Sequence, residues 1–410
     1  MLRRSALGIG FSLALAAMAA SPASAQQTAG ISDNVVRIGI LADMSGVFSD
    51  LSGAGSVAAA KLAVEDFKKK HNPAFGIELV IGDHQNKTDI AVNIARDWYD
   101  NKKVDMITDA INSAVAIAAS KVATEKDRLL IVTGSGSTKI NNEECSKNTL
   151  LYAWNTYSFA ALPATYLTRK GHKKWFFIGI DYAFGHSLQA DATTMIKQEG
   201  GEVVGAVHYP LGTSDFTSYV LQAQSSNADV VALASAGAGL LNSLRTAKDF
   251  GLDKTKQLTI MGGSFDDVVA LGTDVAQGLL IAEGFYWDFD EESRAWSAHF
   301  EAATGKKPSM LNAGLYSAIM QYLAAVSRTG TDTAKDVIAD IRSQKSINDV
   351  FLRNAHLRDD NLMSHDVYLL EVKKPSESKG KWDVYKVIAT ASGEEAFGPI
   401  SQSKCPLVKQ

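Results

Sequence analysis

Short apolar runs recur along the first third of the chain and are separated by longer amphipathic stretches. The runs are rich in β-branched residues and predict strands at 35–41, 77–83, 104–108 and 129–133. The intervening stretches carry apolar residues on one face at helical spacing and predict helices at 55–70, 89–101 and 113–126. This alternation predicts a first βα series.

A second series of the same kind begins near Thr156. Predicted strands occupy 175–181, 203–209, 230–234 and 258–262, and predicted helices occupy 158–170, 187–199, 216–224 and 240–250. Strands that are apolar almost throughout are typical of parallel sheets covered on both faces. Two such series predict an α/β fold of two doubly wound, Rossmann-like lobes with mainly parallel sheets.

The last third departs from strict alternation. It predicts strands at 278–283, 367–372 and 382–388, an extended link at 285–288, and helices at 291–304, 312–328 and 333–342. A segment this long can return to the first lobe and then add strands to the second, which gives three crossings and a hinge. We expect one lobe of residues 31–154 plus 287–363, a second of 155–286 plus 364–395, and a C-terminal tail of 396–410.

The N-terminus has the three parts of a secretory signal peptide. Arg3 and Arg4 precede an uncharged run over 6–20, and the small residues of 21–25 follow. The run is shorter than the roughly 20 residues that cross a bilayer. A twin-arginine signal is the alternative, but the surrounding residues fit it poorly. We therefore expect residues 1–25 to be a cleaved signal peptide, no lipid anchor, and a periplasmic location.

Composition and charge narrow the classes of partner. The chain has 410 residues and net charge −4, and loss of Arg3 and Arg4 makes it −6. No Lys- or Arg-rich stripe is present, so nucleic acid is a poor candidate partner. No second long apolar segment predicts a membrane span. Length alone predicts more than one domain.

The two cysteines, Cys145 and Cys405, predict a single disulfide in an exported protein. It would join the C-terminal tail to the loop that carries Cys145. The alternative, a reactive thiol or metal ligand, lacks an identifiable chemical partner in the sequence.

Six loops that follow predicted strands carry small residues, hydroxyls or amides, and some carry an aromatic ring. They are 43–48, 111–113, 134–138, 181–185, 235–237 and 263–266. Ligands of open α/β sheets bind beyond the carboxyl ends of the strands. Backbone N–H groups at helix starts can hold an anion without Lys or Arg. For any one loop, helix capping explains the same residues better; agreement among six loops favours a cleft between the lobes.

Enzyme motifs are weak. Residues 53–58 fit a loose G-x-G-x-x-A pattern but lie about a dozen residues past the strand, where a pyrophosphate-binding turn cannot form. No phosphate loop, nucleophile elbow or zinc-binding spacing occurs. His186 is a surface or capping candidate, and Asp266 and Asp267 are neighbours at a helix start. We expect no cofactor, metal or catalysis, with a hydrolase as the remaining alternative because triads need not be local in sequence.

The whole chain after residue 25 resembles the type I periplasmic binding proteins, specifically the branched-chain amino-acid (Leu/Ile/Val-binding) group of ABC-importer receptors. The segments that carry the resemblance are Arg37–Gly46, Asp181–Gly185, Gly212–Phe216 with Leu221–Gln224, and Gly278–Trp287. The resemblance implies two lobes that close on a small ligand by a hinge motion, and a membrane permease that accepts the closed form. We expect a monomer.

The resemblance also implies a set of ligand-binding residues. On the first lobe they are Ser45, Phe48, Asn112, Ser113, Ser135, Gly136 and Ser137, and on the second Tyr182, Ser235, Ala236 and Ser264. In amino-acid binders, residues that match Asn112 and 135–137 hold the ligand carboxylate. A Glu grips the ligand ammonium where this chain has Ser264, with Asp266 as a substitute nearby.

This departure predicts the ligand class. A buried ammonium without an anion is costly, so the resemblance is closer to a branch that takes aromatic acids such as benzoates or hydroxycinnamates. We expect a small carboxylate-bearing ligand, aromatic or amino-acid-like. The alternative functions are a ligand-sensing input protein for a membrane receptor and, less favoured, an exported hydrolase.

Overall fold

The computed structural model describes residues 1, 2 and 30–409. The predicted signal peptide, residues 1–25, lies outside the described residues except for its first two. Among the described helices, none combines the length and apolar character needed to cross a bilayer.

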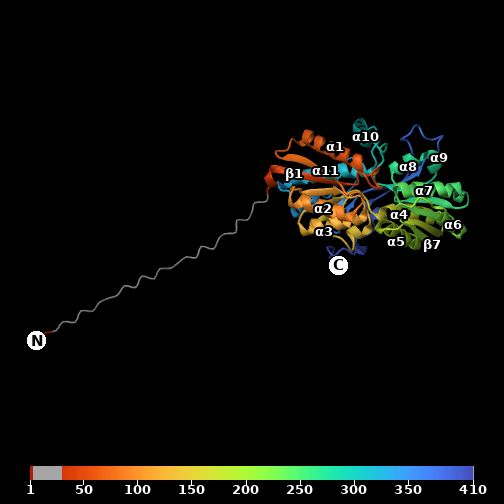
Figure 1. Cartoon of the computed structure of the whole chain (residues 1–410), viewed down its shortest axis with the longest axis horizontal. Helices are drawn as coiled ribbons and strands as arrows, with labels where there is room; N and C mark the ends of the chain where they lie inside the picture. Colours follow the sequence, from red (N-terminus) through yellow and green to blue (C-terminus); the bar gives the residue numbers. More distant parts are fainter. Residues whose placement is uncertain (3–29, 410) are drawn as a thin grey trace.

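The first lobe is built on a five-stranded parallel sheet of order β2-β1-β3-β4-β5. Its strands are β1 (Val35–Ala42), β2 (Gly76–Asp83), β3 (Met106–Asp109), β4 (Leu129–Val132) and β5 (Thr149–Leu151). Helices α1 (Gly53–His71), α11 (Met310–Thr329) and α12 (Ala334–Ser343) lie together, and α2 (Thr88–Asp100) packs with α3 (Ser113–Glu125). In Figure 1, α1 and α11 lie on one side of this lobe and α2 and α3 on the other. Helix α10 (Glu291–Thr304) packs against α1.

The second lobe has a four-stranded parallel sheet of order β7-β6-β8-β9. The strands are β6 (Lys174–Ile180), β7 (Glu202–Tyr209), β8 (Val230–Ala234) and β9 (Gln257–Met261). Beside β9 lies an antiparallel sheet of β10 (Leu280–Glu283), β13 (Val367–Val372) and β14 (Tyr385–Ala391). The helices are α4 (Thr156–Arg169), α5 (Ala183–Gln198), α6 (Thr217–Ser225), α7 (Gly237–Asp249), α8 (Phe265–Leu271), α9 (Thr273–Ala276) and α13 (Gly393–Phe397).

The chain crosses between the lobes three times: after β5, after β10, and between the hairpin β11 (His356–Leu357)–β12 (Met363–Ser364) and β13. The first and third crossings lie side by side. Leu151 pairs with Leu362, and Nε2 of the fully buried His365 lies 2.9 Å from the Ala153 carbonyl oxygen. The predicted fold of two doubly wound lobes with a three-crossing hinge is confirmed.

Short elements account for most differences from the predicted pattern. Strands β3, β4 and β8 are buried along their whole length, and their apolar runs predicted them as strands. By contrast, β5, the β11–β12 hairpin, α9 and α13 were not predicted, and of α8 only a helix start at Asp266 and Asp267 was. Each of these strands and helices has seven residues or fewer, which is too short for hydrophobic periodicity to show. Strand β14 also begins three residues after the predicted 382.

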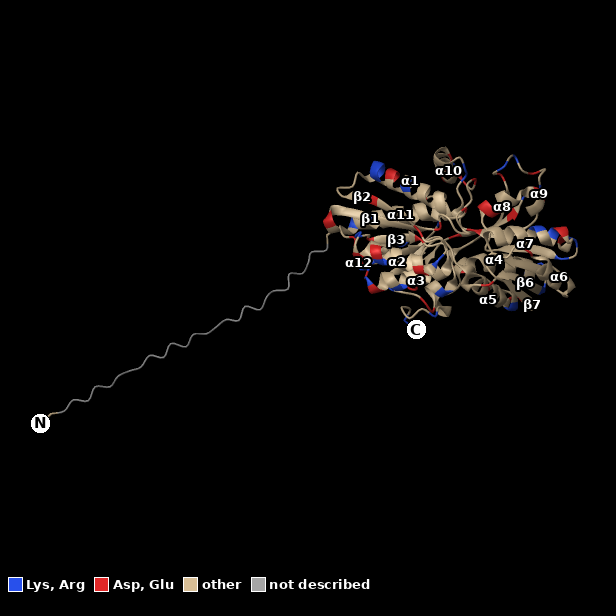
Figure 2. Ribbon diagram, viewed as in Figure 1, with Lys and Arg blue, Asp and Glu red and all other residues tan. Residues whose placement is uncertain are grey.

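The predicted disulfide is confirmed, because Cys145 and Cys405 are bonded to each other and the described residues contain no free cysteine. The bond joins the C-terminal tail to the loop between β4 and β5 of the first lobe. Charged residues are scattered over both lobes without an extended single-sign stretch, as Figure 2 shows.

Candidate functional site

A narrow cavity of about 30 Å³ lies between the lobes at the carboxyl ends of both parallel sheets, within a cleft whose free space, open solvent included, is about 410 Å³. Both lobes and the crossing segment contribute to it. Its lining consists of Phe48, Leu51, Ile111, Ser113, Gly134, Trp154, Phe159, Tyr182, Phe184, Ala236, Gly262, Gly263, Ser264, Met310 and Leu311. None of these residues is charged.

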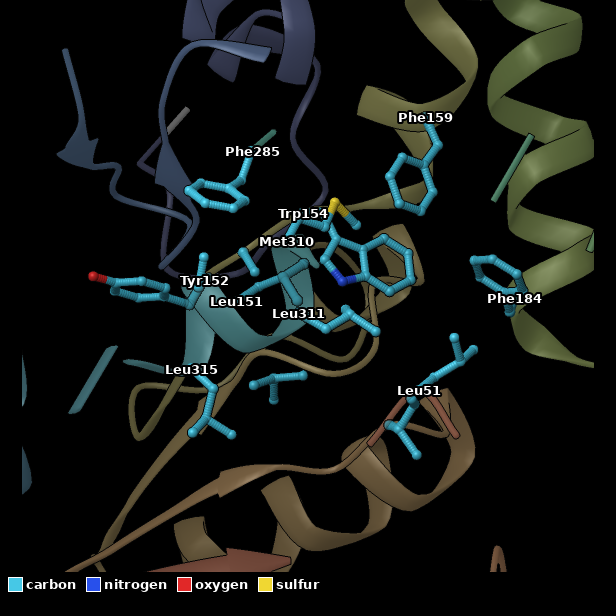
Figure 3. Packing of buried hydrophobic residues seen from close by; sticks show 14 of the residues in the cluster. Leu51, Leu151, Tyr152, Trp154, Phe159, Phe184, Phe285, Met310, Leu311 and Leu315 are labelled. Carbon is cyan, nitrogen blue, oxygen red and sulfur yellow. The ribbon is translucent and has the colours of Figure 1, made fainter. Parts of the chain in front are cut away.

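Aromatic rings form much of the wall. The Trp154 indole stacks on Phe159 with ring centroids 4.5 Å apart and meets the edge of Phe184 at 5.6 Å. Figure 3 shows the indole lying among Phe159, Phe184 and Leu311. Phe48 of the first lobe lies 6.5 Å from Tyr182 of the second, so aromatic contacts span the two lobes across the cavity.

The Trp154 indole carries one hydrogen-bond donor, its Nε1–H. Its Nε1 is buried and makes no hydrogen bond within the described part of the chain. A Cβ on Gly136 would collide with the indole ring, so the absence of a side chain there lets Trp154 lie flat against the loop after β4. A buried N–H without an acceptor is costly, so this donor is available to a group outside the described residues.

Several helices begin at the cavity and differ in whether a side chain caps them. Helix α3 is capped by Asn112, and Asp267 accepts the Ser264 N–H at the start of α8. Helices α5 and α7 begin after Tyr182 and Ala236, and neither has a side-chain cap. Asp267 accepts from Gly237 N at 3.0 Å, but the next N–H groups of α7 have no such partner. Helix starts without caps are ready anion sites.

Five of the predicted site residues line the cavity: Phe48, Ser113, Tyr182, Ala236 and Ser264. The Ser113 and Tyr182 hydroxyls make no hydrogen bond to another described residue, so both are free to meet a ligand. The pKa of Tyr182 is raised by burial, which keeps its hydroxyl protonated.

The other six predicted residues lie outside the lining, and most are occupied elsewhere. The exposed Ser45 donates to Asp83 at 2.6 Å, Asn112 caps α3, and the Ser235 hydroxyl accepts from Tyr209. Ser137 hydrogen-bonds to Ser187 at 2.8 Å. Ser135 is buried without a hydrogen-bond partner, and Gly136 supports Trp154.

The residues that the sequence analysis missed are mainly apolar, namely Leu51, Ile111, Gly134, Trp154, Phe159, Phe184, Gly262, Gly263, Met310 and Leu311. Most lie within or beside the six loops predicted to face the cleft, so the apolar residues of those loops were the signal that could have identified them. Met310 and Leu311 come from α11, and no signal in the sequence places that helix start at the cleft.

Neither nearby carboxylate lines the cavity. Asp267 accepts from the Ser264 and Gly237 N–H groups at 2.9 and 3.0 Å, and burial raises its pKa to about 7. Burial also raises the pKa of Asp266, to about 6. The expectation that Asp266 could take the place of a ligand-gripping Glu finds no support in this geometry.

Backbone strain fixes the first-lobe side of the cavity. Asp109, the last residue of β3, and Ala110 after it have positive φ angles of 80° and 56°. This conformation costs non-glycine residues energy and is concentrated at functional sites. The Asp109 carboxylate accepts from the Ser52 hydroxyl at 2.6 Å, which holds the turn. This turn delivers Ile111 and Ser113 to the cavity.

A family model described as "Periplasmic binding protein" matches residues 35–381. A periplasmic binding protein from Burkholderia mallei is 41% identical, with TM-score 0.89, over 92% of this chain and 100% of that one. A branched chain amino acid ABC transporter periplasmic ligand-binding protein from Burkholderia xenovorans LB400 is 38% identical, with TM-score 0.83, over 91% and 99%.

The fold alone is shared with more distant structures. A solute-binding protein of an ABC transporter from Rhodopseudomonas palustris HaA2, in complex with p-hydroxybenzoic acid, is 20% identical. Its TM-score is 0.78, and the match covers 90% of this chain and 100% of that one. With a family model over most of its length and a cavity between two hinged lobes, the chain belongs to the periplasmic binding proteins, the extracytoplasmic ligand-capturing receptors of ABC transporters.

Proposed function

We propose that this receptor captures a small organic acid with an aromatic or branched apolar body and without a cationic group. One observation carries the proposal: the cavity combines aromatic walls, the uncapped start of α5 and the partly free start of α7 with no charged lining residue. Apolar walls with a few convergent polar groups are typical of small-molecule sites.

The carboxylate of such a ligand would lie near the starts of α5 and α7. The free N–H groups and the positive ends of these helix dipoles favour an anion there. The Ser113 hydroxyl and the Trp154 Nε1–H supply further donors. Together they would hold a carboxylate without Lys or Arg, while the rings of Phe48, Phe159 and Phe184 take the apolar body.

An ammonium group has no matching anion in the lining. Ser264 stands where amino-acid binders carry a Glu, and Asp267 is engaged by two backbone N–H groups. Transfer of an unpaired ammonium into this apolar space would cost several kcal/mol. Branched-chain amino acids remain the second candidate because the Burkholderia xenovorans relative, 38% identical, is named for them.

The proposal also includes the lobe boundaries, the closure of the lobes, the export of the receptor and its partner. Residues 31–154 with 287–363 form one lobe, 155–286 with 364–395 form the other, and 396–410 form the tail. The ligand contacts both lobes and so favours the closed arrangement by its differential affinity. Residues 1–25 direct export of the receptor and are then cleaved. The mature protein works in the periplasm as a monomer and delivers its ligand, chemically unchanged, to an ABC permease.

A thermal-shift screen tests the proposal. Purified protein is heated with aromatic acids, branched aliphatic acids, amino acids, amides and sugars, and ligand at 100 times its Kd should stabilise by about 2.7 kcal/mol. Stabilisation by benzoate, coumarate or 4-methylpentanoate is expected. Stabilisation by leucine or valine with none from these acids overturns it, and recovery of altered ligand after incubation would favour the hydrolase alternative. A sensory role would show as unimpaired uptake in cells that lack the protein.

A further inference from the structure

A second cavity between the lobes lies farther along α5, and its lining, unlike that of the cleft, carries charged side chains. Its volume is about 460 Å³, and it opens to solvent. We call it the tail chamber, because residues 397–404 of the C-terminal tail form one of its walls. The other walls are the segment 138–143, one face of α5, and the β11–β12 hairpin.

The tail is fixed in place as it passes from the second lobe to the first. It leaves α13, which packs on α4, and Arg358 Nη1 then donates to the Gly398 carbonyl at 2.7 Å. Farther on, Lys404 N donates to Asn142 Oδ1 at 2.8 Å, and Cys405 is bonded to Cys145. The chamber therefore has a covalently anchored wall and is bounded by both lobes.

Most charges in the tail chamber neutralise one another. Arg358 pairs with Asp360 at 2.8 Å, and Lys404 pairs with Glu143 at 3.2 Å. Asp191 of α5 is the exception among the acids: it forms no ion pair within the described residues, although the Lys404 charge is near enough to lower its pKa slightly against the larger effect of burial.

Hydroxyl groups hold the Asp191 carboxylate in position. Its Oδ2 accepts from Thr156 at 2.6 Å and from Thr138 at 3.1 Å, while Oδ1 has no hydrogen-bond partner in the described chain. Burial raises the pKa of Asp191 to about 6 despite these two donors. A negative charge that is fixed by hydroxyls but not neutralised is suited to a cation that donates hydrogen bonds.

Two aromatic side chains complete the chamber. Tyr157 and Phe397 both line it, and the Tyr157 hydroxyl is close enough to Asp191 for the carboxylate charge to raise the pKa of the tyrosine, after the larger effect of burial. Aromatic faces accommodate the alkyl stem of an amine and attract its charge. The exposed Lys139 at the edge disfavours ligands with several positive charges.

We propose that the tail chamber binds a small primary amine, with its ammonium group on Asp191 and its alkyl stem against Tyr157 and Phe397. Asp191 and Tyr157 belong to the second lobe, and Thr138 of the first lobe donates to the Asp191 carboxylate.

Calorimetry with n-butylammonium at pH 7.5 tests this site without any cleft ligand, so its outcome is independent of the function proposed above. Tetramethylammonium, a cation without N–H donors, and 1-butanol, which lacks the charge, should bind at least tenfold more weakly. Asp191→Asn should weaken n-butylammonium at least tenfold, whereas Asp249→Asn, an exposed position at the end of α7, should leave its Kd unchanged. Thermal unfolding of both variants shows whether they are folded.

Acidification provides a second readout. The amine stays protonated from pH 7.5 to 5 because alkyl ammonium groups titrate near pH 10. Protonation of Asp191 with a pKa of about 6 should weaken amine binding about tenfold over that range. The other ionisable groups that face the chamber are Lys139, Glu143, Tyr157, His186, Arg358, Asp360 and Lys404. The Asp191→Asn variant should lose this dependence, which separates Asp191 from the other groups. Absence of n-butylammonium binding, or equal binding by Asp191→Asn, overturns the proposal.

Discussion

The cleft and the tail chamber both lie between the lobes, yet their walls are chemically opposite. The cleft is lined mainly by aromatic and aliphatic side chains without a single charge, and its donors are helix starts, the Ser113 hydroxyl and the Trp154 indole. The chamber is lined by Lys, Arg, Asp and Glu side chains, most of them paired. One helix serves both: the start of α5 faces the cleft, and its next two turns carry Ser187 and Asp191 to the chamber.

The difference shows that polar side chains near a cleft are not all available to a ligand. Asn112 and Ser235 are satisfied by a helix cap and by Tyr209, whereas Tyr182 and Ala236 leave the helices that follow them uncapped. Binding capacity in the cleft therefore comes from backbone that side chains leave free. In the chamber it comes from one carboxylate that other side chains do not neutralise.

Removal of the disulfide should have the largest effect, and it should weaken binding in the tail chamber while leaving binding in the cleft almost unchanged. Replacement of both Cys145 and Cys405 by Ala removes a cross-link between residues 260 positions apart, and loss of a native disulfide typically costs about 2–5 kcal/mol of stability. Urea unfolding should show this loss. The affinity for the cleft ligand should stay within twofold, while n-butylammonium should bind at least fivefold more weakly. A loss of cleft affinity with unchanged amine affinity would contradict the assignment of the tail to the chamber.

A charge placed in the cleft should have the next largest effect. Ala236→Asp puts a second carboxylate at the start of α7, where Asp267 already accepts from Gly237 N. The added carboxylate repels an acidic ligand and should weaken its binding about 100-fold in calorimetry. Ala236→Asn lacks the charge and is the matched control. Equal affinities of the Asp and Asn variants would show that no ligand carboxylate lies near α7.

Loss of the Tyr182 ring should have the smallest effect of the three. The ring lies 6.5 Å from Phe48 and 5.9 Å from Phe184 between centroids and closes the cleft. Tyr182→Ala should weaken the cleft ligand about tenfold through lost apolar contact, while Tyr182→Phe should change its Kd by less than threefold. An unchanged Kd in Tyr182→Ala would place Tyr182 outside the site.

The sequence predicted the architecture because long buried strands and amphipathic helices leave a clear pattern. Residues 230–234, for example, were predicted as a strand and form β8 as a fully buried one. The loops after these strands were also placed near the cleft, and Phe48, Ser113 and Tyr182 line it.

The sequence could not show how the polar residues of those loops are used. Whether Asn112 caps a helix or faces a ligand depends on side-chain geometry, since both roles suit an Asn before a helix. The position of Trp154 depends on its packing against Gly136, and the chamber depends on the course of the tail across two lobes. These are tertiary contacts with no local pattern.

Calorimetry on two matched pairs tests the central claim most directly. Leucine is compared with 4-methylpentanoate and phenylalanine with 3-phenylpropanoate, so that each pair differs only in the α-ammonium group. The uncharged cavity lining predicts that the acid without the ammonium binds at least tenfold more tightly in each pair that binds. Tighter binding of leucine or phenylalanine would contradict the account and would require an anion in the cleft.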